Sequence, residues 1–168
     1  MRWSAVPSPI GDLGVAVDEA GICAVSFGGV PSDGQPGDHE LLGRAAGQLR
    51  AYFVGELTEF DLPLSVPRGG DFERAVWMEL ARIPYGDMRT YGEIASAVGG
   101  PPGLRAETDP TGARAVGAAC NRNPLPIVVP CHRVVGANGR LVGFGGGLAR
   151  KRHLLELEAR VTLERTWR

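Results

Sequence analysis

The stretch that decides how this chain is interpreted comprises residues 123–134, which read Asn-Pro-Leu-Pro-Ile-Val-Val-Pro-Cys-His-Arg-Val. A short apolar run, Ile127–Val129, ends at a proline, and Cys131, His132 and Arg133 follow at once. A cysteine is a nucleophile only as the thiolate, which nearby cationic or imidazole groups favour. Because neighbours on an extended chain point to opposite sides, contact between Cys131 and His132 needs a turn after the proline or a bridging water. The pattern favours a nucleophilic Cys131 over the buried structural thiol that an arbitrary cysteine would be.

The residues before this stretch predict a small sheet with one helix. Residues 4–27 alternate short apolar runs with turn signals, which predicts a β-hairpin or meander. Residues 28–38 are rich in Gly and Pro and predict a loop. Apolar residues recur at helical spacing over 39–53, and the proline-containing segment 57–70 predicts a linker.

The second half predicts mainly helices. An apolar face starting at Phe72 predicts a helix that stops before Pro84. Residues 90–93 read Thr-Tyr-Gly-Glu, a capping-box pattern at the start of another helix. After a break over 99–111, small residues predict a helix over about 112–121. The last two helices resemble a helix-turn-helix, although the break is longer than its usual tight turn.

Composition and cysteine usage bound the class of protein. With 168 residues and 43% hydrophobic side chains, the chain can bury the core of one large domain or two small ones. No apolar run approaches the roughly 20 residues that span a bilayer, and the N-terminus lacks a long apolar signal core. The cysteines Cys23, Cys120 and Cys131 form an odd, sparse set without a CxxC pair. We therefore expect a cytoplasmic protein with no metal site and no membrane partner.

The charge is distributed unevenly along the chain. Residues 1–70 carry four basic and nine acidic side chains, whereas residues 71–168 carry fourteen basic and ten acidic ones. Residues 110–155 hold seven basic side chains and no carboxylate. Such a stretch is typical of a face that binds a polyanion. The alternative is a solvated surface neutralised by acidic residues from elsewhere in the fold.

An ordered set of segments resembles one known family, the O6-alkylguanine-DNA alkyltransferases (methylated-DNA–protein-cysteine methyltransferases). These segments are IPYGDMRTYGEIASAVG, ARAVGAACNRNP, NPLPIVV, PCHRV and VGANGRLVGFGGGLARKRHLLELE. The likeness covers about residues 70–159 strongly. SPIG near the start and AYFVGELTEF at 51–60 resemble the family's N-terminal domain more loosely.

The resemblance implies a catalytic relay. Cys131 matches the acceptor that takes the alkyl group from guanine O6, and His132 matches the residue that removes the thiol proton through a water. Glu158 matches the acid that orients this histidine. The residues alone leave Glu156 and Glu158 both open, and only the family register selects Glu158. A third group that orients the base is the usual logic of an activated nucleophile.

The resemblance also implies a substrate pocket. Asn123 matches an asparagine that ties the helix-turn-helix to the active-site loop, and the hydroxyl of Tyr91 matches the group that donates to guanine N3. The glycine-rich residues 143–147 match the loop that closes over the extruded base. The residues expected to line the pocket are Val134, Phe144, Gly145 and Gly146. Some members have Tyr-Ser at the positions of Phe144 and Gly145, so a backbone N–H would replace the serine hydroxyl here.

For DNA binding, the resemblance implies that Arg114 enters the duplex and fills the gap left by the flipped nucleotide. The helix bearing it would lie in the minor groove, where little base sequence is read. Thr90 and Ala115 also match DNA-contacting positions. Candidates for phosphate contacts are Arg122, Arg133, Arg140, Arg150, Lys151 and Arg152. Arg133 has a structural role as its alternative.

These inferences combine into one hypothesis. We expect a mixed α/β (α+β) fold with an N-terminal α/β domain over 1–66 and a C-terminal DNA-binding alkyltransferase domain over 67–168. The expected function is stoichiometric transfer of the alkyl group from O6-alkylguanine in double-stranded DNA to Cys131, without a cofactor. The protein is expected to be a monomer, and cooperative binding on DNA stays open. Cys120, on the second helix, is expected to be packed rather than alkylated.

Three other functions account for only part of the sequence. Non-catalytic lesion-binding proteins of similar sequence have tryptophan at the acceptor position, and Cys131 argues against that reading. A thiol hydrolase using Cys131 and His132 does not account for the arginine-rich, acid-free region. A plain transcription regulator leaves the Cys-His-Arg cluster unexplained.

Overall fold

The computed structural model describes residues 1–99 and 110–167, in which strands come first and helices dominate later. Two units can be distinguished by their internal contacts. The N-terminal unit comprises Met1–Pro67 with Pro124–Val128, and the C-terminal unit comprises Arg68–Asn123 with Val129–Arg168. The mixed α/β fold is confirmed. The domain boundary between residues 66 and 67 stays a prediction, and most of the predicted break at 99–111 lies outside the described residues.

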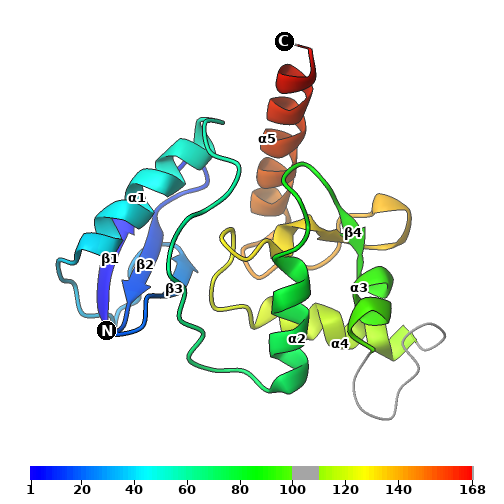
Figure 1. Ribbon diagram of the computed structural model, residues 1–168, viewed down its shortest axis with the longest axis horizontal. Helices are drawn as coiled ribbons and strands as arrows, with labels where there is room; N and C mark the ends of the chain where they lie inside the picture. The colour runs from blue at the N-terminus through cyan, green and yellow to red at the C-terminus, as the bar shows by residue number, and fades with distance from the viewer. Residues whose placement is uncertain (100–109, 168) are drawn as a thin grey trace. The chain divides into compact units, whose positions relative to one another are not determined.

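The N-terminal unit is built on an antiparallel meander in the order β1-β2-β3. Its strands are β1 (Arg2–Val6), β2 (Leu13–Val17) and β3 (Ile22–Phe27). Each residue of this central strand β2 is buried, so both of its faces are covered, because successive side chains of a strand point to opposite faces. The helix α1 (Glu40–Phe53) packs against this sheet (Figure 1). The meander predicted for residues 4–27 is confirmed.

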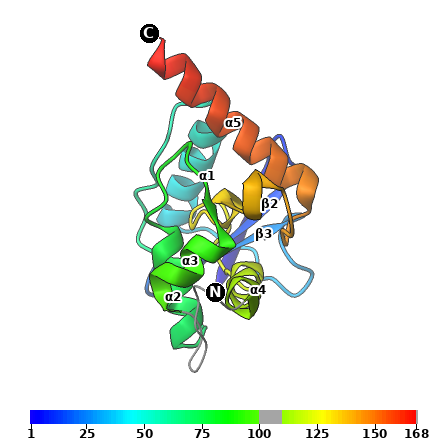
Figure 2. The ribbon, with the colours of Figure 1, turned by 90° about the vertical axis from the view of Figure 1, so that its right-hand side faces the viewer.

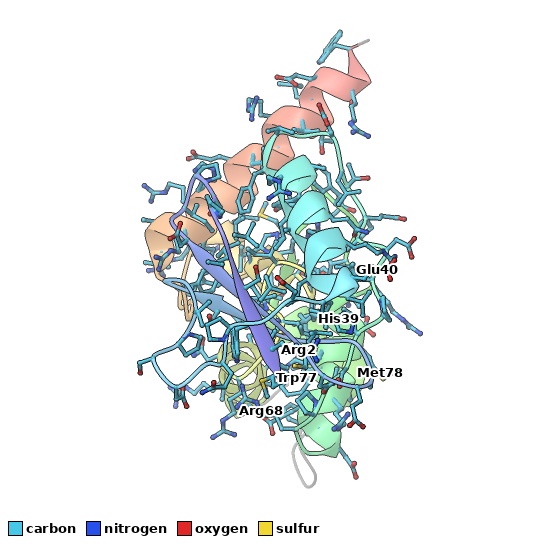
Figure 3. All side chains as sticks on the ribbon, turned by 90° about the vertical axis from the view of Figure 1, so that its left-hand side faces the viewer. Arg2, His39, Glu40, Arg68, Trp77 and Met78 are labelled. Atoms are coloured by element: carbon cyan, nitrogen blue, oxygen red, sulfur yellow. The ribbon has the colours of Figure 1, made fainter. Side chains whose placement is uncertain are left out.

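The helix α1 begins where a side chain can replace the missing backbone acceptors. His39 is the N-cap, and its Nδ1 accepts the Leu41 N–H at 3.0 Å. Figure 3 shows His39 and Glu40 at this end of the helix. Leu42 and Leu49 are buried on the face toward the sheet, at the spacing that predicted the helix.

The segment 57–70 is more than a linker. It forms no helix, but the Ile22 N–H donates to the Pro63 carbonyl at 2.9 Å, and the Ser65 N–H donates to the Ile22 carbonyl at 2.8 Å. The Ser65 hydroxyl also donates to the Asp18 carboxylate at 2.7 Å. Part of the predicted linker is therefore fixed along β3, because the strand had unpaired backbone groups on that side.

The C-terminal unit packs three helices around one another (Figure 2). These are α2 (Asp71–Leu80), α3 (Tyr91–Val98) and α4 (Pro110–Asn121). The indole N–H of Trp77 donates to the Ala119 carbonyl at 2.8 Å and joins α2 to α4. The predicted capping box is confirmed, since Thr90 Oγ1 accepts the Glu93 N–H and the Glu93 carboxylate accepts the Thr90 N–H.

The remaining elements of this unit carry the site. The 3-10 turn η1 (Cys131–Arg133) leads into β5 (Val134–Val135), which pairs in parallel with β4 (Arg89–Thr90). A second 3-10 turn, η2 (Ala137–Gly139), precedes the long helix α5 (Leu148–Thr166). Within the described residues, no helix combines the length and apolar character needed to cross a membrane.

Candidate active site

Cys131 lies at the start of η1 and is buried, with 5% of its surface exposed. The chain turns here, because the Cys131 N–H donates to the Val129 carbonyl at 2.8 Å and the Arg133 N–H donates to the Pro130 carbonyl at 3.0 Å. Burial raises the pKa of the Cys131 thiol to about 11, although the Asn123 side chain and the Lys151 charge oppose it. The resting thiol is therefore protonated at neutral pH and needs a base before it can act as a nucleophile.

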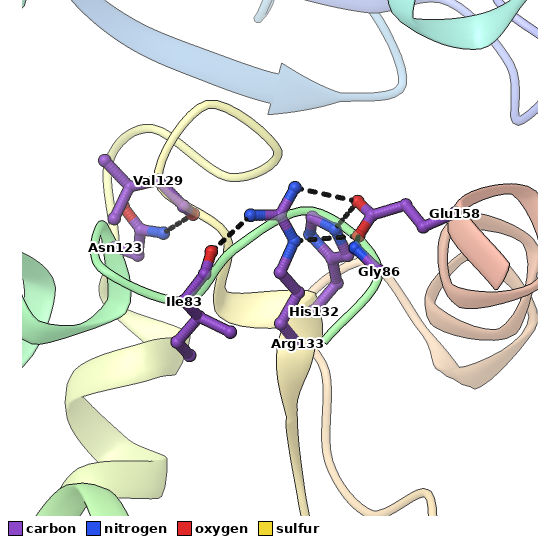
Figure 4. Close-up of polar contacts among 7 residues, drawn as sticks. All are labelled: Ile83, Gly86, Asn123, Val129, His132, Arg133 and Glu158. Atoms are coloured by element: carbon purple, nitrogen blue, oxygen red, sulfur yellow. Dashed lines mark hydrogen bonds and ion pairs between the residues drawn. The ribbon is translucent and has the colours of Figure 1, made fainter. Parts of the chain in front are cut away.

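His132 and Glu158 form a buried pair. His132 Nε2 lies 2.6 Å from Glu158 Oε2, and these side chains are 0% and 1% exposed (Figure 4). Burial by itself would raise the pKa of Glu158, but hydrogen bonds and charge from His132 and Arg133 outweigh it and lower the pKa to about 2. A carboxylate only accepts, so the proton of this hydrogen bond belongs to Nε2.

The other nitrogen of His132 has the properties of a base. Burial lowers the pKa of His132, with Glu158 opposing, which favours the neutral ring. With the proton on Nε2, Nδ1 carries a lone pair. Nδ1 is buried and has no hydrogen-bond partner among the described residues. The side chain next to Cys131 therefore offers an unused acceptor.

Glu158 is held by groups from two segments that are distant from it in sequence, the turn at Gly86 and the turn η1. Its Oε1 accepts the Arg133 Nε–H at 2.8 Å and the Gly86 N–H at 3.0 Å. Gly86 has φ of 83°, and a Cβ at this position would lie 2.3 Å from Thr162 Oγ1, so the approach to α5 requires glycine. Sequence reasoning did not single out Gly86, whose only signal was the Pro-Tyr-Gly turn before β4.

Asn123 lies after α4 and reaches the active-site turn. Its Nδ2 donates to the Val129 carbonyl at 2.8 Å, two residues before Cys131 (Figure 4). This is the kind of contact that the resemblance implied for Asn123. It couples the end of the helix to the turn that carries the thiol.

Two of the residues predicted to contact phosphate, Arg133 and Lys151, are buried in the structure. Arg133 is 6% exposed, and its Nη1 donates to the Ile83 carbonyl at 2.7 Å. Lys151 is 0% exposed, and its Nζ donates to the Val134 carbonyl at 2.5 Å and the Val142 carbonyl at 3.2 Å. Both cations are turned inward by partners that the local sequence does not reveal. The internal contacts of Arg133 favour the structural alternative stated for it.

A cavity of about 290 Å³ opens beside Tyr91. Its lining consists of Tyr91, Ala113, Arg114, Gly117, Asn121, Val142 and Gly143. The Tyr91 hydroxyl donates to the Val142 carbonyl at 3.1 Å, and burial raises the pKa of this hydroxyl. The phenol therefore keeps its proton and can offer it to a ligand in the cavity.

The other predicted pocket residues lie in varied positions. Phe144 is half-buried, Gly145 is exposed, and Gly146 is buried with its carbonyl accepting from Arg150 Nη1 at 3.1 Å. The carbonyl of Val134, another predicted pocket residue, accepts from the Lys151 ammonium. The glycine-rich loop contributes Gly143 to the cavity wall.

The remaining predicted DNA contacts differ in exposure. Arg114 is exposed on α4, and Ala115 beside it is half-buried. Arg122 is exposed and lies 3.6 Å from the Glu73 carboxylate. Thr90 is half-buried and occupied as the N-cap of α3. Arg140 and Arg152 are exposed, whereas Arg150 is half-buried.

The described residues contain no candidate metal centre. In that part of the chain, no group of three or more His, Cys, Asp or Glu side chains is placed to hold an ion. Burial raises the pKa of Cys120 to about 12, and burial also raises the pKa of Cys23. Glu156, the alternative to Glu158, is exposed.

Comparison with known proteins gives a consistent result along the whole chain. Residues 71–160 match the family described as "6-O-methylguanine DNA methyltransferase, DNA binding domain", and residues 1–66 match its "ribonuclease-like domain". The methylated-DNA–protein-cysteine methyltransferase of Methanosarcina acetivorans is 46% identical over 94% of this chain and 98% of its own. That of Mycobacterium bovis is 56% identical over 68% of this chain and 63% of its own.

A solved structure agrees with these matches. The crystal structure of Mycobacterium tuberculosis OGT in complex with DNA superimposes with a TM-score of 0.82 at 44% identity, covering 96% of this chain and 94% of the other. The resemblance found from the motifs is thus confirmed by the whole-chain matches and by the fold. The chain belongs to the 6-O-methylguanine DNA methyltransferase family, whose curated members are methylated-DNA–protein-cysteine methyltransferases.

Proposed function

We propose that this protein repairs O6-alkylguanine in double-stranded DNA by moving the alkyl group to Cys131, once per molecule. The observation that carries the proposal is the buried relay behind the thiol, in which Glu158 fixes Nε2 of His132 and leaves Nδ1 unpartnered. Membership in the methyltransferase family supplies the reaction class.

The chemistry follows from these groups. A water between Cys131 and Nδ1 of His132 carries the thiol proton to the imidazole, and the Glu158 carboxylate stabilises the imidazolium. The thiolate then attacks the alkyl carbon in line with the bond to O6. A carbon–sulfur bond forms, the carbon–oxygen bond breaks, and its electron pair stays on the guanine, where the Tyr91 hydroxyl stabilises it by donating a hydrogen bond to N3. The guanine becomes neutral by taking one proton from solvent, and this balances the proton that the His132 imidazolium later releases.

The same chemistry accounts for a single turnover. The product on Cys131 is a thioether, and a thioether sulfur has no good leaving path back to a thiol under these conditions. No cofactor is needed, because the substrate itself supplies the group transferred and the chain supplies the base. The protein is then consumed in proportion to the lesions it repairs.

Access to O6 calls for base flipping, because the reacting atom is out of reach of a nucleophile inside the stacked duplex. Arg114 is exposed on α4 and lines the same cavity as Tyr91. Such a position suits a side chain that replaces the extruded nucleotide while the base enters the cavity. Small residues such as Gly117 on this face of α4 leave room for the base and for the DNA backbone.

Double-stranded DNA is the proposed partner. The related M. tuberculosis protein was crystallised in complex with DNA, and the exposed Arg114, Arg122, Arg140 and Arg152 give this chain cations for phosphate contacts. A monomeric state, cooperative binding on DNA and a cytoplasmic location stay predictions.

The deciding experiment is mass spectrometry of the whole protein and of its peptides after incubation with a duplex that contains one O6-methylguanine. We expect one methyl group per protein, on the peptide that carries Cys131. Cys131→Ser should abolish the modification, and Cys120→Ser, a second buried cysteine, should keep it. Folded protein that binds the lesion duplex without gaining a methyl group would instead support the non-catalytic lesion-binding function.

A further inference from the structure

Arg133 is a buried cation to which the proposed reaction gives no role. It follows His132 directly in η1, and its side chain is a planar guanidinium cation with five N–H donors. Its Nε and Nη2 donate to the two oxygens of Glu158 at 2.8 and 3.1 Å, a bidentate arrangement. Its third contact, to the Ile83 carbonyl, and the Tyr85 ring 5.6 Å from its centre keep the guanidinium in place.

The Glu158 carboxylate is thereby shared between the side chains of Arg133 and His132, with the Gly86 N–H as a third donor. Oε1 accepts from Arg133 and the Gly86 N–H, and Oε2 accepts from Arg133 and His132 (Figure 4). Each oxygen has two donors, and a carboxylate offers about two lone-pair positions per oxygen. Without Arg133, the His132–Glu158 pair would favour a doubly protonated imidazole, because an unshared buried carboxylate attracts a second proton onto its histidine.

Charge balance shows what the sharing achieves. A buried anion is costly unless a cation compensates it. With Arg133 present, the compensating charge is permanent and His132 can stay neutral, as a base must. Without Arg133, protonation of His132 would become the means of compensation, and the lone pair on Nδ1 would be lost.

We propose that Arg133 is a positioning residue of the transfer reaction, which acts by sharing Glu158 with His132 and so keeps the imidazole neutral with its proton on Nε2. The inference rests on the proposed function, since it concerns the base that activates Cys131. It replaces the phosphate contact that the sequence predicted for Arg133.

Other charged groups face this cluster and also affect the pKa values of His132 and Tyr85. On α5, Lys151 lowers the pKa of His132, as Arg133 does, whereas Glu158 raises it. Tyr85 lies against Arg133, and burial raises the pKa of its hydroxyl. The charges of Arg160 and Arg165 oppose this rise and lower the pKa of Tyr85. Of these cations, Arg133 is the one bonded to the same carboxylate as His132.

The test is the pH dependence of the single-turnover methyl-transfer rate, measured with protein in excess over the lesion duplex. Under saturating protein the rate constant reports the site, and the amplitude reports the amount of active protein. Arg133→Met should move the acid limb of the profile to higher pH by about one unit, which lowers the rate below the midpoint about tenfold. Arg133→Lys keeps the charge, so its profile should lie close to that of the wild-type protein, with most of the shift absent.

Arg122→Met provides the opposite pattern. Removal of an exposed cation from a DNA-facing position should weaken DNA binding and reduce its salt dependence by about one counterion, without moving the acid limb. If Arg133→Met behaves like Arg122→Met, or if it lowers only the amplitude, the positioning role is overturned. If the wild-type protein transfers no methyl group at all, the proposed function fails instead.

A measurement that needs no activity covers the case in which Arg133→Met does not fold. The chain has three histidines, so nitrogen NMR of the full-length wild-type protein can resolve His132 from His39 and His153. We expect a neutral His132 ring at pH 7 with the proton on Nε2. A proton on Nδ1, or a charged ring at that pH, would overturn the proposal. In Arg133→Lys the tautomer should be retained.

Discussion

Cys131 and Cys120 are two buried thiols of the same unit, and their comparison shows what makes a cysteine reactive. Burial raises the pKa of both, to about 11 for Cys131 and about 12 for Cys120. The resting pKa therefore does not separate them. Cys131 begins a 3-10 turn and is followed by an imidazole with an unpartnered nitrogen, whereas Cys120 lies in the last turn of α4 with no histidine adjoining it in the chain. The proposed difference is the base.

The largest expected effect tests that difference directly. Cys131→Ala should eliminate methyl transfer from O6-methylguanine duplex, because no other group can take the methyl carbon. Cys120→Ala should keep one methyl per protein in the same mass-spectrometric assay. Methylation of Cys120 in the Cys131→Ala protein would show that burial without an adjacent base suffices, and the comparison would collapse.

Removal of the base should have the next largest effect. In His132→Gln the thiol of Cys131 keeps its raised pKa but loses the group that accepts its proton. General-base catalysis is worth roughly 10²- to 10⁴-fold, so the single-turnover rate should fall by that order at pH 7. Quenched-flow transfer measurements check this, and a recovery of rate at high pH, where the thiol ionises unaided, should accompany the loss. An unchanged rate at pH 7 would exclude His132 as the base.

Variants of two neighbouring carboxylates, Glu158 and Glu156, test whether Glu158 is the group that makes His132 an effective base. Glu158→Gln removes the charge that stabilises the His132 imidazolium and presents an amide nitrogen to Arg133, so we expect a loss of about 10²-fold in rate. Glu156→Gln changes the exposed carboxylate two residues away and should leave the rate within about twofold. Similar losses in both variants would mean that the effect comes from α5 as a whole rather than from the relay.

Acid stability gives the smallest expected effect. The folded pKa of Glu158 is about 2, below the ordinary value of 4.5, so the ionised carboxylate stabilises the fold above about pH 4.5 and that contribution is lost as pH falls toward 2. The lowered pKa of His132 acts in the same direction, because below pH 6.5 protonation favours the unfolded chain. Denaturant unfolding at pH 7 and pH 3.5 measures the sum.

Glu158→Gln isolates the contribution of the Glu158 carboxylate to the pH dependence of the unfolding free energy. The wild-type protein should lose on the order of 1 to 2 kcal/mol of unfolding free energy from Glu158 between pH 7 and pH 3.5, and the glutamine variant should lack this part of the loss. Equal acid losses in the two proteins would place Glu158 at an ordinary pKa, and the charge argument for the relay would not stand.

Several elements could be predicted from the sequence because their causes are local. The apolar spacing of 39–53 predicted α1, since a helix repeats every 3.6 residues whatever surrounds it. The Thr-x-x-Glu pattern predicted the cap at Thr90, since the two hydrogen bonds close within four residues. The chemistry of Cys131 was indicated by its immediate neighbours, and the family register added Glu158.

The errors have a common physical cause. The charge pattern predicts Arg133 and Lys151 as phosphate contacts, with a structural role as the alternative for Arg133, because such a pattern carries no information on burial. In the folded chain Arg133 meets a carboxylate 25 residues later, and Lys151 meets a carbonyl 17 residues earlier. The segment 57–70 was likewise expected to be a free linker, although β3 supplies partners for its backbone.

The sequence by itself therefore determined the local elements, the nucleophile and the family of this protein. The tertiary structure decided which charges are exposed, which nitrogen of His132 is free, and how Gly86, Arg133 and His132 converge on Glu158. The Gly86–Glu158 hydrogen bond joins residues 72 positions apart. Contacts of this kind depend on how whole elements pack, because burial and hydrogen-bond geometry are properties of the assembled core rather than of any one segment.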